Sequence, residues 1–251
     1  TSMAMWDVRF SRPDLLNLWG HDVGVATGIE LRRETYGDDR DPRLDGTITY
    51  TDLRGVTTGS DVMGASPTPD TSGARTVKSG FLELAAPLIS PEMEVPLIHS
   101  FETQLAARYE DYSFFGDVLK PKVAASWRPV EWLMFRSAWS EGFRAPNLPQ
   151  QFERGIIRSN TRTDWVRCEA RLRKGLIANF DACSDTVSVQ SVRSGSEDLQ
   201  PESSKNFTAG VVLQSYFVPE RFGTLTVTAD VWQIDQTDVI GIFGDSNHVT
   251  L

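Results

Sequence analysis

Charged side chains that could form ion pairs or contact a polar solute recur at alternate positions in otherwise apolar segments of this chain. In an extended strand, successive side chains point to opposite faces, so a spacing of two residues places such groups on one face. A one-sided charged face can hold ion pairs or receive a polar partner, and the alternative is the solvated face of a soluble sheet. The charged residues in this pattern are Glu30, Arg32, Glu34, Glu102, Arg108, Glu110, Arg136 and Asp230.

Catalytic and metal-binding patterns are not found. The sequence contains no G-x-S-x-G, P-loop, H-E-x-x-H or G-x-G-x-x-G motif. His21, His99 and His248 are scattered and show no ligand spacing. The acidic run at 38–41 lacks the glycine and the terminal glutamate of a calcium loop, so a solvated loop tip is expected there. We therefore predict no catalytic residue, no metal site, no cofactor and no enzymatic activity.

Cys168 and Cys183 lie in one polar, loop-like segment. Two cysteines in a single loop favour a disulfide formed in an oxidising compartment, and the alternative is two unpaired thiols. Closing a loop of about 15 residues would contribute on the order of 3 kcal/mol. A zinc site is disfavoured, because no histidine or further cysteine is near them in sequence.

Composition limits the class of protein. A chain of 251 residues can form one large domain or two small ones, and its net charge of -9 argues against a nucleic-acid partner. No apolar stretch reaches the roughly 18 residues of a membrane helix, whereas membrane β-strands need only about 9–11 residues. The first ten residues contain no secretory signal, so we expect the natural N-terminus to be missing or processed.

Alternation of apolar and polar residues predicts about eight to ten antiparallel strands, an all-β chain. The clearest case is 98–112, and a short helix near 169–177 is possible. The strand segments are 15–19, which would form a hairpin with the next one, then 23–36, 77–88, 98–112, 121–127, 132–140, 206–214 and 225–232.

The connections between these strands fall into two sizes. Short turns are expected at 20–22, 89–96, 128–131 and 216–223, and long loops at 37–76 and 141–204, with a moderate one at 112–120. Because short and long connections alternate along the chain, all the long ones should lie at one end of the strands. Outer-membrane barrels are built in this way.

Three motifs carry a resemblance to a known family. They are WSEGFRAPNLPQQF at 139–152, DLQPESSKNFTAGVV at 198–212 and LTVTADVWQIDQTDVIG at 225–241. In this order and at this spacing they resemble barrel segments of TonB-dependent outer-membrane receptors. The resemblance runs from about Gly20 to the C-terminus.

The resemblance implies an antiparallel transmembrane barrel of about 22 strands with an N-terminal plug domain. It further implies import of a scarce solute of the siderophore, cobalamin or glycan type across the outer membrane of a Gram-negative bacterium, energised through the TonB complex. The apolar strand faces would contact outer-membrane lipid, and the loops 37–76 and 141–204 would be extracellular. Residues expected to contact solute or plug are Arg144, Phe152, Arg136, Glu102 and Arg108.

The chain departs from the family pattern at both ends. It shows no plug domain before the barrel, and 248–251 resemble an outer loop rather than a terminal strand. We therefore expect a barrel fragment that does not transport alone. Two other classes stay open: a small self-closed outer-membrane porin or adhesin, and a secreted soluble β-sandwich binding module.

Overall fold

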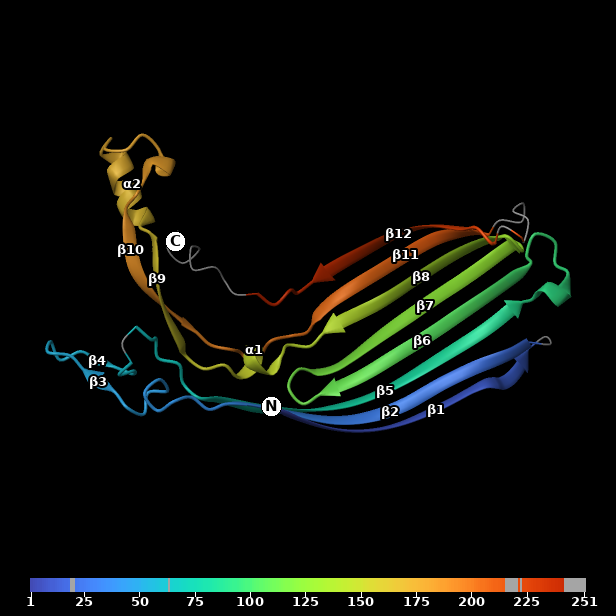
Figure 1. The fold of residues 1–251 in the computed structure, drawn as a ribbon, viewed down its shortest axis with the longest axis horizontal. Helices are drawn as coiled ribbons and strands as arrows, with labels where there is room; N and C mark the ends of the chain where they lie inside the picture. The colour runs from blue at the N-terminus through green and yellow to red at the C-terminus, as the bar shows by residue number, and fades with distance from the viewer. Residues whose placement is uncertain (19–20, 63, 215–220, 222, 242–251) are drawn as a thin grey trace.

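The computed structural model describes residues 1–18, 21–62, 64–214, 221 and 223–241. Among these residues the principal feature is one antiparallel sheet of eight strands (Figure 1). In spatial order they are β1 (Ser2–Leu18), β2 (His21–Asp38), β5 (Thr71–Ile89), β6 (Ser100–Tyr112), β7 (Gly116–Val130), β8 (Leu133–Arg144), β11 (Glu202–Gln214) and β12 (Thr226–Thr237). The prediction of an all-β antiparallel fold with about eight to ten strands is confirmed. Within the described residues β1 and β12 are the two open edges of the sheet.

The sheet has two chemically different faces, as the alternation predicted. On the first, which we call the apolar face, large hydrophobic side chains are exposed; Ile29 is 58% exposed and Leu105 48%. Register places the other members of this set beside them. They include Val8, Leu31, Leu82, Leu119, Val123, Phe135, Trp139 and Phe207.

The second face, which we call the polar face, carries the alternating charged residues of β2, β5, β6, β8 and β12. Buried residues gather at one end of it, where the chain folds back over the sheet. They include Val77, Tyr112, Ser79, Glu110, Leu148, Gln151 and Glu202.

Both long connections lie at the same end of the strands, which we call the loop end (Figure 1). There β2 joins β5 through 39–70, and β8 joins β11 through 145–201. At the opposite, turn end the connections are 90–99, with a short 3-10 helix η1 (Pro91–Met93), and 131–132. Parts of the expected turns at 20–22 and 216–223 fall outside the described residues, as do 248–251.

The moderate loop expected at 112–120 was wrong. Strand β7 already begins at Gly116, so 113–115 alone connect it to β6. Gly116 has a φ of +88°, which a residue without a side chain adopts at little cost and which closes a three-residue hairpin.

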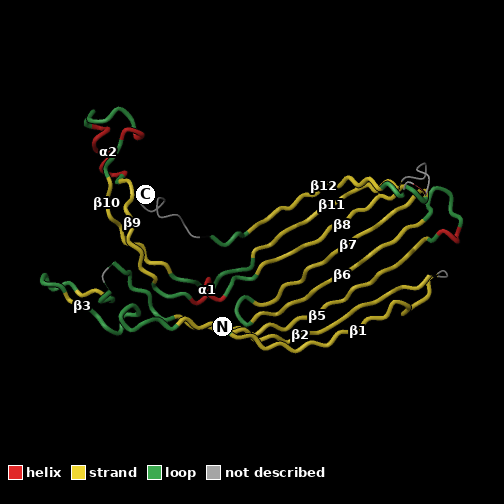
Figure 2. The backbone as a smooth tube through the Cα atoms, in the orientation of Figure 1, coloured by secondary structure: helices red, strands yellow, loops and turns green. Residues whose placement is uncertain are grey.

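The strands also extend further than the alternation indicated, so the two long connections begin later and end earlier than the expected loops 37–76 and 141–204. Both contain regular structure (Figure 2). Segment 39–70 holds a small hairpin of β3 (Tyr50–Thr51) and β4 (Thr57–Thr58). Its turn is closed by Asp52, and the backbone N–H of Val56 holds the pKa of that carboxyl below its usual value.

Segment 145–201 is a second structured excursion. It contains α1 (Leu148–Phe152), β9 (Ile156–Thr163), α2 (Trp165–Arg173), the 3-10 helix η2 (Phe180–Ala182) and β10 (Thr186–Arg193). Helix α2 begins four residues before the possible helix at 169–177, because the Asp164 side chain accepts a hydrogen bond from the Arg167 backbone N–H and caps it there. Among the described residues, no helix has the length and apolar character needed to cross a membrane.

Candidate functional site

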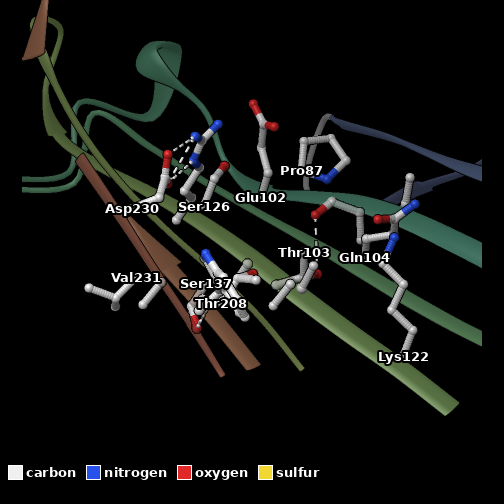
Figure 3. Close-up of a pocket in the computed structure, with 18 residues that line it drawn as sticks. Pro87, Glu102, Thr103, Gln104, Lys122, Ser126, Ser137, Thr208, Asp230 and Val231 are labelled. Carbon is white, nitrogen blue, oxygen red and sulfur yellow. Dashed lines mark hydrogen bonds and ion pairs between the residues drawn. The ribbon is translucent and has the colours of Figure 1, made fainter. Parts of the chain in front are cut away.

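A row of five residues crosses the polar face from β6 to β12. Register aligns them in the order Glu102, Ser126, Arg136, Gly210 and Asp230. Glu102, Ser126, Arg136 and Asp230 line a hollow of about 950 Å³ on this face (Figure 3). The hollow therefore lies toward the turn end of the sheet, since its lining includes Pro87 near the end of β5 and Glu102 near the start of β6.

An ion pair in the hollow joins Arg136 to Asp230. The guanidinium donates to the two carboxylate oxygens at 2.7, 2.9 and 3.1 Å (Figure 3). These residues lie on β8 and β12, with β11 between them, and Gly210 makes the bridge possible. A Cβ at Gly210 would overlap the Asp230 carboxylate, so any other residue there would displace this pair.

Other charged and amide groups complete the lining. Gln104 donates to Glu83 across β5 and β6. Glu102 and Lys122 also line the hollow, and neither forms an ion pair with any residue that the structure describes. A polar partner or solute entering the hollow would therefore find one unpaired carboxylate and one unpaired ammonium group.

A second polar cluster occupies the loop end of the same face. Arg32 pairs with Glu30 at 2.8 Å and with Glu34 at 2.7 Å. Arg75, on the neighbouring strand β5, donates to the other oxygen of Glu34 at 2.7 Å. Its Nη1 donates to the carbonyl of Pro146 at 2.5 Å. Arg75 thus ties the strand face to the chain that leaves β8.

Aromatic groups surround this cluster. The Tyr112 hydroxyl donates to Glu110 at 2.7 Å, and Arg108 pairs with the same carboxylate at 2.5 Å. The Tyr112 ring stacks on Phe115 with centroids 4.6 Å apart, and the Arg75 guanidinium carbon is 5.5 Å from its centroid. Charge and aromatic surface are therefore combined in one place.

The motif at 139–152 crosses from strand to loop. Its Arg144, the last residue of β8, forms a two-point pair with Glu202 at the start of β11. Glu202 is 2% exposed and also accepts a hydrogen bond from the Ile240 backbone N–H at 2.7 Å. The pair closes the base of segment 145–201.

Helix α1 lies against the polar face. Asn147 and Gln150 form a reciprocal capping box that starts the helix. The Phe152 ring rests on Gly73, where a Cβ would overlap it, and meets Phe114 edge-on at 5.1 Å. Gly73 shares the parity of Arg75 on β5, so α1 is on the polar side of the sheet.

The residues expected to contact solute or plug are divided between these places. Arg136 and Glu102 both line the hollow, and Arg108 belongs to the cluster of ion pairs and aromatic rings at the loop end. Arg144 and Phe152 make packing and ion-pair contacts at the loop base. Three residues that line the hollow or the loop-end cluster were not singled out in the sequence analysis, namely Arg75, Lys122 and Tyr112. Extending the alternation of β5 back to Thr71 would have placed Arg75 on the charged face.

The two cysteines are joined. A disulfide links Cys168 of α2 to Cys183, which follows η2, and Cys168 is fully buried. Next to it Arg171 pairs with Asp185 at 2.7 Å. The bond holds the far end of segment 145–201 as one compact unit.

Comparison with known proteins gives a consistent result. The family model described as "TonB dependent receptor-like, beta-barrel" matches residues 6–250. No curated protein matches the chain. Among solved structures, the siderophore receptor PirA from Acinetobacter baumannii is similar, with a TM-score of 0.59 and 15% identity; the match covers 93% of this chain and 27% of PirA. The ferric enterobactin receptor PfeA from Pseudomonas aeruginosa, as its G324V mutant, gives a TM-score of 0.56 and 17% identity. That match covers 93% of this chain and 26% of PfeA. The chain thus spans about a quarter of the length of these receptors.

Proposed function

The chain belongs to the TonB dependent receptor-like β-barrel family, and from this premise we propose that it forms part of the wall of an outer-membrane receptor that imports a scarce solute. At this low identity the likeness to PirA and PfeA shows a shared fold. The solute and the energy source are part of the proposal.

The observation that carries the proposal is the sheet with two different faces. Its eight strands are 12 to 19 residues long, and a membrane-spanning strand needs about 9–11. Exposed hydrophobic side chains on one face match a lipid boundary, and paired charges on the other match a barrel lumen.

The two ends of the strands then have different surroundings. We place the loop end, with 39–70 and 145–201, outside the cell and the turn end in the periplasm, since outer-membrane barrels have long outer loops and short inner turns. A plug domain would lie against the polar face, where Glu102 and Lys122 offer unpaired charges. Energy would come through TonB.

The solute is proposed to be a ferric siderophore. This choice is supported by PirA, a siderophore receptor, and by PfeA, a ferric enterobactin receptor. Cobalamin and glycans are the other solutes that receptors of this family would take.

The test uses the complete gene that carries this segment. It is expressed in a Gram-negative host without its own siderophore receptors, with and without a functional TonB protein. Accumulation of radiolabelled ferric siderophores, cobalamin and oligosaccharides is measured. We expect one solute class to accumulate only when TonB functions. Uptake that does not depend on TonB would instead show a passive pore, and no uptake of any solute would refute the proposal.

A further inference from the structure

The ribbon of β9 and β10 in segment 145–201 carries positive charge only. Both strands are eight residues long, IIRSNTRT and TVSVQSVR, and neither contains Asp or Glu. They contain Arg158, Arg162 and Arg193. This composition is unexpected in a chain whose net charge is -9.

Register places the three arginines on one face of the ribbon. Arg158 lies opposite Ser191, Arg162 opposite Val187, and Arg193 opposite Ile156. Since cross-strand partners share a face and side chains alternate along each strand, these six residues point to the same side. The other side carries no charge: it consists of Ile157, Ser159, Thr161, Thr163, Thr186, Ser188, Gln190 and Val192.

Two of these arginines are close neighbours with no opposing charge. Arg193 is diagonal to Arg158, a relation in which residues are about 7–8 Å apart. Both are exposed, and neither pairs with a carboxylate among the residues that the structure describes. Among the described residues, the Arg158 side chain donates to the neighbouring Ile157 carbonyl, at 3.1 Å. Like charges so placed repel each other, and a bound anion would relieve the repulsion.

Arginines elsewhere in the loop-end segments show the contrast. Arg171 pairs with Asp185, Arg173 with Glu169, and Arg54 with Asp52. A carboxylate partner is supplied within the chain at those positions, whereas the described residues supply none at Arg158 and Arg193.

The ribbon is rooted on the polar side of the sheet. Segment 145–201 leaves β8 through Pro146, which Arg75 holds from the polar face, and through α1, whose Phe152 lies on Gly73. From there the ribbon projects beyond the loop end of the strands (Figure 1). A solute approaching the lumen would pass this root, whereas lipid lies against the opposite face of the sheet.

We propose that Arg158 and Arg193 form an anion-binding face that selects, among possible solutes, one with a net negative charge, such as a ferric chelate of catecholate or carboxylate groups. This inference rests on the proposed receptor function and names the charge class of its solute. A guanidinium pair suits such a ligand because planar donors bind carboxylate and phenolate oxygens at two points.

The experiment compares binding by the complete receptor in detergent. The probes are a trianionic ferric tris-catecholate and a neutral ferric trihydroxamate, and binding is followed by quenching of intrinsic fluorescence. The variant is Arg158→Gln/Arg193→Gln. The control is Arg43→Gln/Arg54→Gln in segment 39–70, which removes the same amount of charge from arginines that already have acidic partners.

We expect the ribbon variant to lose about tenfold or more in affinity for the anionic probe, with a weaker dependence on salt. Binding of the neutral probe should be unchanged, and the control variant should bind both probes as wild type does.

The inference is overturned, with the receptor function intact, if wild type prefers the neutral probe or if the ribbon variant binds both probes as wild type does. It is also overturned if the variant keeps its affinity for the solute but no longer copurifies with phosphorylated glycolipid. The arginines would then bind lipid phosphate and not the solute. TonB-dependent uptake in cells, measured in parallel, reports separately on the receptor function.

Discussion

At the level of single residues, two arginine–carboxylate pairs of similar geometry differ in burial. The Glu202 side chain, paired with Arg144, is 3% exposed, while Asp230, paired with Arg136, is 41% exposed. An exposed ion pair contributes about 0–1 kcal/mol, whereas removing one partner of a buried pair leaves a desolvated charge and costs about 3–5 kcal/mol. The Arg144 side chain is itself about half exposed, so the cost at this pair should be lower than that range.

We therefore expect Arg144→Met to destabilise the complete receptor by about 1–3 kcal/mol, and Arg136→Met by less than about 1 kcal/mol. Thermal unfolding in detergent, read from heat-modifiable gel migration, measures both. In the double variant Arg144→Met/Glu202→Gln the cost should be smaller than the sum of the two single changes. Additive costs would mean that Arg144 and Glu202 do not act as a pair.

At the level of elements, the docking of α1 decides how segment 145–201 is held. Phe152 lies directly on Gly73, so Gly73→Ala should push the ring away and loosen α1. We expect protease cleavage within 145–201 to become faster while the unfolding temperature of the barrel changes little. Gly80, on the same strand, is the control, because a Cβ there meets its nearest atom at 3.5 Å, an ordinary contact. If Gly73→Ala and Gly80→Ala are cleaved at the same rate, α1 is not held by this contact.

The disulfide makes a second prediction for this segment. Trypsin sites at Arg171, Arg173 and Lys174 lie between Cys168 and Cys183. Cleavage there should give two fragments that stay together on a non-reducing gel and separate after reduction. In Cys168→Ser/Cys183→Ser the fragments should separate without reductant, and cleavage should be faster because about 3 kcal/mol of loop restraint is lost. Fragments of wild type that separate without reductant would show free thiols instead.

The strands could be predicted from the sequence because their period of two is a local signal. It is clear at 98–112, where apolar and polar side chains alternate strictly, and β6 occupies 100–112. It failed in β1, where Pro13 requires a register shift between Arg12 and Leu16, and the residues before Leu15 were not recognised as a strand. It failed also in β9 and β10, whose polar residues show no apolar face. Contacts such as Arg75 with Pro146 join positions 71 residues apart and depend on register, which no local pattern contains.

At the level of the whole molecule, the proposal requires that the two faces of one strand have different surroundings. Leu105 and Gln104 are neighbours in β6 and point to opposite faces. Leu105 is 48% exposed on the apolar face, and Gln104 donates to Glu83 in the hollow. In a soluble sheet an arginine could replace an exposed leucine without loss of stability. In a membrane the arginine side chain would enter the hydrocarbon layer.

Leu105→Arg should therefore destabilise the complete receptor in lipid bilayers by about 2–4 kcal/mol, the cost of a basic side chain near the bilayer midplane. Gln104→Arg is the matched control and should be tolerated, because its guanidinium keeps Glu83 as a partner in a polar lumen. The measurement is the folded fraction in vesicles over a urea series, read by heat-modifiable migration. Equal tolerance of both substitutions would place Leu105 in water and would contradict a lipid-facing sheet. A loss confined to Leu105→Arg would assign the apolar face to lipid. The polar face, with the hollow and the second polar cluster around Arg32 and Arg75, would then line the path of the solute.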